Sequence, residues 1–582
     1  MPASQRITDR MVAGSIFVAT VLLLLATTDV GFTRDEGFYF RAGQLYVGWF
    51  EDLWANLWAG DLAASFSQEN IDQHWAYNPE HPVLMKAAFA LSHKIFHDIL
   101  GVMSPSTAWR FPAMLCAAAL VSGVYLFARE LGGQLAGLVA AAALLFQPRF
   151  FFHAHMACFD VPITAFWFWV TYAYWRSYDS KRWALATGIL FGLALSVKLN
   201  AFFLPIVLVG HWVLTHWREF RFQRTEDDEP AFQFAPIPKA FWSMLVFGPL
   251  LFYALWPRHW FDTFARVRWY MEFHLEHEHY FVQYFGQDLQ IPPFPVSYPW
   301  VMSLVTIPTV ILVAFAIGAI HYFWQSGQWQ RWKDTVKALG QRRWPQLDSK
   351  ADYRGTGLLL AINIIFPIAL IASPDTPIFG GTKHWMPAMP FVAILAGLGV
   401  VAVMRGLRPW VEKRLGSSTN FAMPIVAGVL TACVVVPAAR TTVDNHPQGT
   451  AYYNELIGSY QGAADGEMVR QFWGHSSGEA LPWLNEHASE DGRVWIHKIL
   501  GHAWDVYLEE ERARPDLRAS SQRASNYALY HQQAEFSYLL LPLWEDYGTM
   551  APAHVVDIAG VPLVSVYVRP DSGKLKYPDV WR

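Results

Sequence analysis

The sequence predicts a polytopic α-helical membrane protein that ends in an α/β domain outside the membrane. Three observations support this fold class: an apolar composition, a series of long apolar segments, and a more polar stretch after residue 440. Of the 582 residues, 53% are hydrophobic and only 16% are charged, which is too apolar for a soluble chain of this size. The net charge of -4 argues against nucleic acid as a partner.

Eleven apolar segments are candidates for membrane-spanning helices, since a span takes about 20 mostly apolar residues. With the N-terminus in the cytosol, Lys and Arg are about three times as dense in the predicted cytoplasmic loops as in the outer loops. This asymmetry predicts that the C-terminus lies on the outer side. The candidate spans lie near 11–31, 110–128, 134–147, 158–175, 183–197, 201–217, 240–256, 300–323, 355–373, 385–404 and 421–438.

The chain is predicted to divide at residue 440. Residues 1–440 form the transmembrane part, with long outer loops at 32–109 and 257–299, and residues 441–582 form a small α/β domain outside the membrane. Short β-type runs separated by Gly, Pro and charged clusters indicate that domain. The predicted elements are β-type runs at 494–499, 536–543 and 561–568 and a helical stretch at 476–487.

Asp35 and Glu36 follow the first apolar segment, so two carboxylates are held at a membrane surface. That position suits chemistry on a lipid-borne substrate. The alternative is that these acidic residues only mark the place where a membrane helix meets water.

Other ionisable groups are predicted to fall on the same outer side of the membrane. Such groups cost about 2.5–3.5 kcal/mol at the centre of a membrane helix, and they usually mark a polar pathway or a site. One outer cavity lined by these groups is therefore the simplest interpretation. They are His81, Lys86, Arg149, His153, His155, Asp160, Lys198, the acidic and histidine-rich run 272–279, Lys383 and His384.

Each of these groups also has a simpler interpretation. Lys86 and Lys198 could only extend their ammonium groups to lipid headgroups. The run 272–279 could bind a metal ion, but its alternation of His and Glu is also typical of a solvated interfacial helix. A divalent ion therefore stays an open question, with Glu36 and His277 as candidate ligands.

The order of several motifs resembles glycosyltransferase family 39, a group of GT-C membrane enzymes. The motifs are the Asp35-Glu36 pair, His81-Pro82-x-x-x-Lys86, the stretch from Pro148-Arg149 to Asp160, Lys198, and Ser373-Pro-Asp-Thr-Pro-Ile-Phe-Gly-Gly-Thr-Lys-His384. The family includes protein O-mannosyltransferases and the bacterial aminoarabinose transferases of lipid A. The resemblance extends over most of residues 30–475.

The resemblance implies transfer of a sugar from a polyprenyl-phosphate donor to a lipid, glycan or protein acceptor. It also implies an enzyme of the inner membrane of a bacterium, with its site facing the periplasm or exterior. By position, Asp35 would be the catalytic base, with Asp160 and Glu36 as further acidic residues. The donor phosphate would be bound by Lys86, Lys198 and Arg149, and the substrate-site candidates are His81, His155, Lys383 and His384.

One departure from the family pattern affects the acceptor. The aminoarabinose transferases place an Arg three residues after the first Asp of the pair, where this chain has Phe38 and an Arg only at Arg41. This difference weakens an assignment to lipid A modification.

Phosphate is already a good leaving group, so the predicted chemistry needs cations for its developing charge and a carboxylate for the acceptor proton. With the base on the acceptor side, a single displacement would invert the anomeric centre. Two other functions stay open. A transporter or flippase would move a lipid or sugar without changing it, and a silent scaffold would only bind through residues 441–582.

Overall fold

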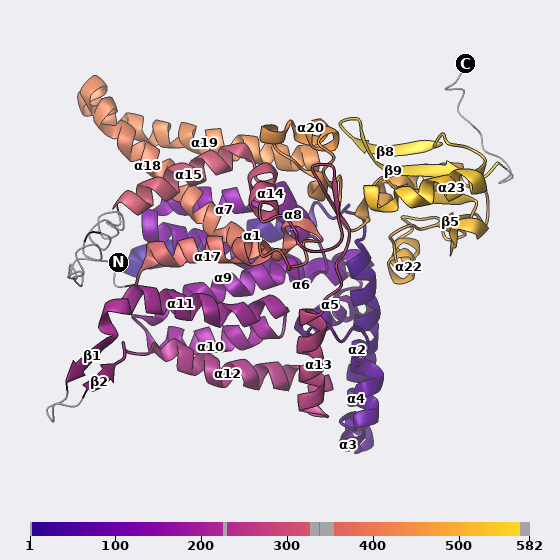
Figure 1. Cartoon of the computed structure of the whole chain (residues 1–582), viewed down its shortest axis with the longest axis horizontal. Coiled ribbons are helices and arrows are strands. Elements are labelled where there is room, and N and C mark those ends of the chain that lie inside the picture. Colours follow the sequence, from indigo (N-terminus) through magenta and orange to yellow (C-terminus); the bar gives the residue numbers. More distant parts are fainter. Residues whose placement is uncertain (1–2, 225–229, 326–336, 338–353, 571–582) are drawn as a thin grey trace.

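The computed structural model describes residues 3–224, 230–325, 337 and 354–570. Long helices lie side by side in one part of the molecule, and a small β-sheet with short helices lies at one end of them (Figure 1). The N-terminus lies at the opposite end of the long helices (Figure 1). Residues 571–582, which the sequence assigns to the outer domain, are outside the described residues.

Each of the predicted spans contains a helix. Among the described residues, four helices are long and apolar enough to cross a membrane, or up to six if each of two bent pairs is one span. The count of eleven therefore stays a prediction. The helices are α1 (Ala3–Leu25), α6 (Pro105–Gly132), α7 (Gln134–Leu145), α9 (Asp160–Ser177), α10 (Lys181–Leu195), α11 (Leu204–His216), α12 (Lys239–Leu255), α15 (Thr309–Gln325), α17 (Thr356–Ile371), α18 (Met389–Leu415) and α19 (Thr419–Asn445).

The predicted span 300–323 is not one continuous helix. It is divided into α14 (Tyr298–Thr306) and α15, which meet at an angle of 112°. Ile307 has an extended backbone because it precedes Pro308, and proline disfavours the helical conformation of the residue before it. A second bend of 74° separates α7 from α8 (Pro148–Ala154), again at a proline.

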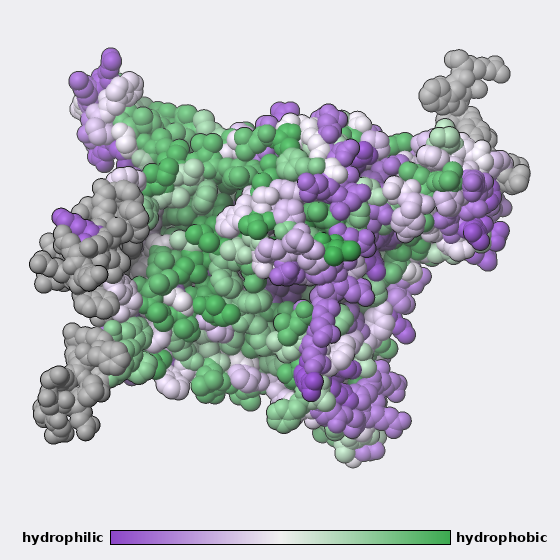
Figure 2. All heavy atoms as spheres, in the orientation of Figure 1, coloured by the Kyte–Doolittle hydropathy of each residue, from purple (hydrophilic) through white to green (hydrophobic). Residues whose placement is uncertain are grey.

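Apolar side chains cover the outer surface of the long helices. On α19, Phe421, Ile425, Val429 and Val436 are all more than half exposed. Figure 2 shows hydrophobic residues over the helical part of this face and hydrophilic ones over the end that carries the sheet. An exposed apolar surface of this extent is typical of contact with lipid, and the chain is an integral membrane protein.

The loop after the first helix is itself helical. It lies at the same end as the sheet, where α2 and α4 lie across the ends of the long helices together with α13 (Figure 1). The elements of this loop are α2 (Arg34–Ala59), α3 (Leu62–Ser65), α4 (Gln68–Trp75), α5 (Leu84–Ser92) and the π-helix η1 (His93–Ile99). Later in the membrane part come α13 (Thr263–Leu275) and two antiparallel strand pairs, β1 (Arg221–Arg224) with β2 (Pro230–Gln233) and β3 (Val282–Tyr284) with β4 (Gln287–Leu289).

The residues after α19, called here the outer region (446–570), contain a five-stranded sheet in the order β6-β5-β7-β9-β8. Strand β5 pairs in parallel with β6 and β7, whereas β9 is antiparallel to β7 and β8. Its elements are α20 (Ser459–Asp465), α21 (Leu481–His487), β5 (Arg493–Trp495), α22 (Gly501–Glu509), β6 (Arg518–Ser520), β7 (Tyr527–His531), α23 (Leu540–Tyr547), β8 (His554–Ile558) and β9 (Val561–Val568).

Two sequence expectations need correction here. The predicted strand 536–543 is wrong, because these residues form a 3-10 turn (Ala534–Leu539) and the start of α23. Pro542 lies in the first turn of α23, where its missing N–H costs no helical hydrogen bond, whereas in a central strand it would remove one. The expected boundary at residue 440 falls inside α19, which continues to Asn445. The strand expected at 561–568 is present as β9.

Candidate functional site

The site begins with the way in which α2 starts. Thr33 is the N-cap residue of this helix, and Thr33-Arg34-Asp35-Glu36 has the spacing of a capping box. The Glu36 carboxylate accepts a hydrogen bond from Thr33 N at 2.9 Å, and the Thr33 hydroxyl accepts one from Glu36 N at 3.4 Å. These contacts fix the conformation of the first turn of α2.

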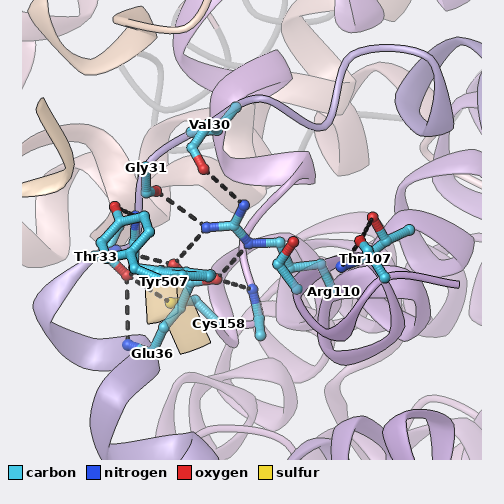
Figure 3. Close-up of polar contacts among 12 residues, drawn as sticks. Val30, Gly31, Thr33, Glu36, Thr107, Arg110, Cys158 and Tyr507 are labelled. Carbon is cyan, nitrogen blue, oxygen red and sulfur yellow. Dashed lines mark hydrogen bonds and ion pairs between the residues drawn. The ribbon is translucent and has the colours of Figure 1, made fainter. Parts of the chain in front are cut away.

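Glu36 is held in a fully buried ion pair with Arg110 of α6 (Figure 3). Arg110 Nε lies 2.8 Å from Glu36 Oε1 and Arg110 Nη2 lies 3.0 Å from Oε2, while Ala157 N also donates to Oε1 at 3.0 Å. The same guanidinium donates to the carbonyl oxygens of Val30 and Gly31 at 2.9 and 3.0 Å. We call Val30, Gly31, Thr33, Glu36 and Arg110 the buried clamp.

The outer region packs directly on this clamp. Phe32 N donates to the hydroxyl of Tyr507 at 2.6 Å, and Arg34 N donates to the carbonyl of Trp473 at 2.9 Å. A Cβ on Gly31 would lie 2.0 Å from the carbonyl oxygen of His475, so only glycine fits at this close approach. The start of α2 is thereby attached both to α6 and to the outer region.

Asp35, the neighbour of Glu36, points instead into a large cavity. The cavity has a volume of about 870 Å³ and is lined by residues from the ends of the long helices and from the outer region. The predicted residues Asp35, His81, Asp160, Lys198, His277, Lys383 and His384 all line it.

Two lysine–aspartate pairs lie in the wall of this cavity. Lys198 Nζ donates to Asp160 Oδ1 at 2.7 Å, and Lys383 Nζ lies 3.5 Å from Asp35 Oδ2. The Lys383 ammonium also lies over the ring of Trp473, 4.3 Å from its centroid. Since Asp160 opens α9 and Asp35 opens α2, the chain has brought together charges from four separate segments. We call Asp35, Asp160, Lys198 and Lys383 the charged wall.

For two histidines of the cavity, His81 and His384, the surroundings favour the neutral ring. Burial lowers the pKa of His81 well below its usual value, and the nearby cations of Lys86 and Lys198 lower it further. Burial and Lys383 lower the pKa of His384 in the same way. His277 stacks on Phe379 with 5.1 Å between the ring centroids. Lysines also line the cavity, among them Lys198 and Lys383.

Four residues with a predicted catalytic, phosphate-binding or substrate role do not line the cavity, and neither does His153. Lys86 is buried and donates to the carbonyl of Asn78 at 2.7 Å, and Arg149 donates to the carbonyl of Tyr452 at 3.1 Å. His155 is bound between Phe151 O and the hydroxyl of Thr27. Glu36 is the fourth, and both of its carboxylate oxygens accept hydrogen bonds from Arg110 in the buried clamp.

The proposed metal ligands Glu36 and His277 do not come together. Among the described residues, the one group of three or more His, Cys, Asp or Glu side chains close enough to share an ion is His93, His97 and Asp98, outside the cavity. His277 Nδ1 is bound to the carbonyl of Glu278 at 2.7 Å. The geometry does not fit an ion shared by Glu36 and His277.

The sequence patterns missed several cavity residues. Glu80 lines the cavity beside His81, so its adjacency to that motif was a usable signal. Lys498 and Glu535 also line it and lie 3.4 Å apart in an ion pair. Burial lowers the pKa of Lys498. These two residues come from the outer region, and no motif there indicated that it closes the cavity.

The fold and the site thus define an integral membrane protein with a large cavity, lined by paired charges, at one end of its helices. Residues 80–225, about a quarter of the chain, match the family model described as dolichyl-phosphate-mannose-protein mannosyltransferase. This match confirms, over that stretch, the predicted resemblance to family 39 of the GT-C membrane glycosyltransferases. A comparison with curated protein sequences gives no match.

Solved structures of two kinds are similar over most of the chain. ArnT from Cupriavidus metallidurans bound to undecaprenyl phosphate has a TM-score of 0.48 and 12% sequence identity, covering 98% of this chain and 99% of that one. ArnT in the apo state has a TM-score of 0.45 and 15% identity over 97% and 98% of the two chains. The oligosaccharyltransferase AglB from Archaeoglobus fulgidus, in complex with an inhibitory peptide and a dolichol-phosphate, has a TM-score of 0.42 and 11% identity over 81% and 58%.

Proposed function

We propose that this chain is a membrane glycosyltransferase that moves a sugar from a polyprenyl-phosphate donor to a lipid, glycan or protein acceptor in the cavity. The observation that carries the proposal is the charged wall, in which two carboxylates and two lysines from separate segments face one cavity. The family match over residues 80–225 supports it, since its description names a phosphate-linked sugar donor.

Lys198 and Lys383 are the proposed ligands of the donor phosphate. An ammonium group has three donor protons, and Asp160 occupies one of those on Lys198. The others are free to bind phosphate oxygens, and such charge-assisted bonds become stronger as the phosphate gains charge on leaving. Lys86 and Arg149, which the sequence also suggested, donate to backbone carbonyls and do not line the cavity, so we do not propose them as phosphate ligands.

Asp35 is the proposed base. Its carboxylate takes the proton of an acceptor hydroxyl while the acceptor oxygen bonds to the anomeric carbon of the sugar. The bond from that carbon to the phosphate oxygen breaks, and polyprenyl phosphate leaves with the bonding electron pair. Attack opposite the leaving group inverts the anomeric centre, and Asp160 keeps Lys198 in position beside the phosphate.

The test is a donor-consumption assay, because a transporter or a scaffold would release no free polyprenyl phosphate. Asp35→Asn keeps the size of the side chain but removes its basicity, so sugar transfer should fall by at least about 10²-fold. The yield and the thermal unfolding of the protein should hardly change, since the Asp35 side chain is 29% exposed.

Asp375→Asn is the matched control, because Asp375 also lines the cavity but lies outside the charged wall. Its transfer rate should stay within a few-fold of wild type. Sugar transfer at the wild-type rate by the folded Asp35→Asn variant would show that Asp35 is not the base.

We also propose the inner membrane of a bacterium as the location, with the cavity facing the periplasm or exterior and residues 441–582 forming an outer domain. The excess of Lys and Arg in the predicted cytoplasmic loops over the predicted outer loops supports this orientation. A reporter that works only outside the cytosol, fused after Asn445, should be active. An inactive reporter at that position would indicate the opposite orientation.

A further inference from the structure

Two histidines and an aspartate come together outside the cavity, on the π-helix η1. His93, His97 and Asp98 each offer one ligand atom, and these atoms lie within 4.8 Å of one another. The three residues are spaced i, i+4 and i+5. In an α-helix of about 3.6 residues per turn, position i+5 would be turned well away from position i.

The π-helix explains why these side chains share a face. Its turns are wider because the backbone bonds join residues five apart, as in the bond from Leu100 N to Ile95 O at 3.0 Å. Short π-helical turns cost stability and occur often at functional sites. The wide turn is therefore a local structure that places two imidazoles and a carboxylate together.

A further carboxylate, outside this group of three, approaches His97 from the outer region. Glu509, the last residue of α22, has its Oε1 atom 3.3 Å from His97 Nε2, and His93 Nδ1 lies 3.5 Å from Asp98 Oδ1. Two ligand atoms of a tetrahedral zinc ion with bonds of about 2.0–2.1 Å are separated by about 3.3–3.4 Å. Both separations are close to the distance expected between ligands of one ion.

A hydrogen bond to its second ring nitrogen orients His97, as is usual for a metal-binding histidine. His97 Nδ1 donates to the carbonyl of Met103 at 3.0 Å, which leaves the lone pair of Nε2 directed at Glu509. His93 stacks on Trp109 with 4.7 Å between ring centroids.

One cation lies beside the group. Lys94 Nζ is 3.4 Å from Asp98 Oδ2 and 2.9 Å from Glu51 Oε1. It therefore contacts the carboxylate oxygen of Asp98 that faces away from His93, and Glu51 offsets its charge. Oδ1 of Asp98 stays available as a ligand.

We propose that His93, His97, Asp98 and Glu509 bind a divalent zinc-like metal ion that joins η1 to α22 of the outer region. Two imidazoles and two carboxylates suit Zn²⁺ better than Mg²⁺ or Ca²⁺, which prefer oxygen ligands alone. The ion would strengthen an existing contact between the outer region and α6, in which Glu510 accepts a hydrogen bond from Ser106 N at 2.6 Å. Its role is to fix the outer region over the cavity, and the site exists whether or not the chain transfers a sugar.

Metal binding is tested on the full chain in detergent, purified without a histidine tag and stripped with a chelator. Titration with Co²⁺ alone should give the absorption bands of a tetrahedral cobalt site, at one ion per chain and with micromolar or tighter affinity. Zn²⁺ should displace Co²⁺ and raise the thermal unfolding temperature, because it binds only the folded chain.

Substitutions of the proposed ligands test where the ion binds. His93→Gln and His97→Gln should each weaken Co²⁺ binding by at least about 100-fold, since loss of an orienting partner alone typically costs about 10–100-fold. Glu509→Gln should weaken it by about 10-fold. His502→Gln, which removes another partly exposed histidine from the same helix α22, should leave the affinity unchanged.

Absence of Co²⁺ binding would overturn the proposal, and so would equal affinity in the wild type and in both histidine variants of η1. Folding of each variant is checked by chromatography and circular dichroism in the presence of chelator. If a histidine variant does not fold, Asp98→Asn decides the question instead, because it removes the negative charge of a ligand while keeping the size of the side chain.

Discussion

Asp35 and Glu36 are neighbours in the chain, yet they belong to two regions with opposite properties. In the charged wall, the Asp35 carboxylate is 29% exposed and its lysine partner lies 3.5 Å away. In the buried clamp, Glu36 and Arg110 are both 0% exposed, and each carboxylate oxygen accepts at least two hydrogen bonds. The first arrangement leaves hydrogen-bonding capacity for a ligand, whereas the second leaves none.

This difference shows that a pair of acidic residues at a membrane surface can divide two tasks between its members. Glu36 determines where α2 begins and how the outer region packs on it, and Asp35 is thereby held at the cavity. Removal of charge from the clamp should mainly affect folding. Removal of charge from the wall should mainly affect the handling of substrate.

The largest effect is expected in the clamp. Arg110→Ala leaves the Glu36 carboxylate buried without its charged partner, and removal of one member of a buried ion pair typically costs about 3–5 kcal/mol. The yield of folded protein and the thermal unfolding temperature in detergent should both fall strongly. Addition of Glu36→Gln to Arg110→Ala should recover part of the loss, because it removes the unpaired charge. An unchanged unfolding temperature in Arg110→Ala would contradict the clamp.

A smaller effect is expected for Lys198 in the charged wall. Hydrogen bonds to charged groups are worth about 1.5–3 kcal/mol, so Lys198→Met should weaken donor binding by roughly 10–100-fold. The single variant also leaves Asp160, which is 6% exposed, without its closest cation, so some stability is lost as well. The double variant Lys198→Met with Asp160→Asn should regain stability without regaining donor affinity. Donor affinity at the wild-type level in the double variant would show that Lys198 is only a structural partner of Asp160.

The local part of the site was predictable, and the long-range part was not. The capping box of α2 can be found in the four residues from Thr33 to Glu36, because both partners lie within one helical turn. The pairing of Glu36 with Arg110 joins residues 74 positions apart, so it depends on how α2 and α6 pack. The Glu36 carboxylate, which the sequence predicted as a catalytic group or metal ligand, is for this reason bound by Arg110 instead.

The same limit applies to the other polar residues. The cost of ionisable groups near a membrane predicted a cavity, and Asp35, Asp160 and Lys198 line it. That cost is relieved equally well by a backbone carbonyl, which is the partner that Lys86 and Arg149 have. Sequence alone does not distinguish these two ways of satisfying a buried charge.

The fold shows a similar division. Apolar length located a helix in every predicted span, since that signal is local. It missed the 112° bend between α14 and α15, although Pro308 was a signal for it. The segment 536–543 was assigned to a strand from its apolar and aromatic residues, but Pro542 and the leucines beside it suit the start of a helix.

The smallest effect on stability is expected for Lys383, and it tests the contrast most directly. Lys383→Met removes the cation from Asp35 just as Arg110→Ala removes the cation from Glu36, but it keeps an apolar stem against Phe379 and Trp473. Because Asp35 retains contact with solvent, the loss of stability should be about 1 kcal/mol or less. Release of polyprenyl phosphate should still fall, since Lys383 is a proposed phosphate ligand. Thermal unfolding and donor consumption measured on the same preparation separate the two outcomes. If Lys383→Met unfolds as readily as Arg110→Ala, the charged wall is a second clamp and the contrast between the two regions does not hold.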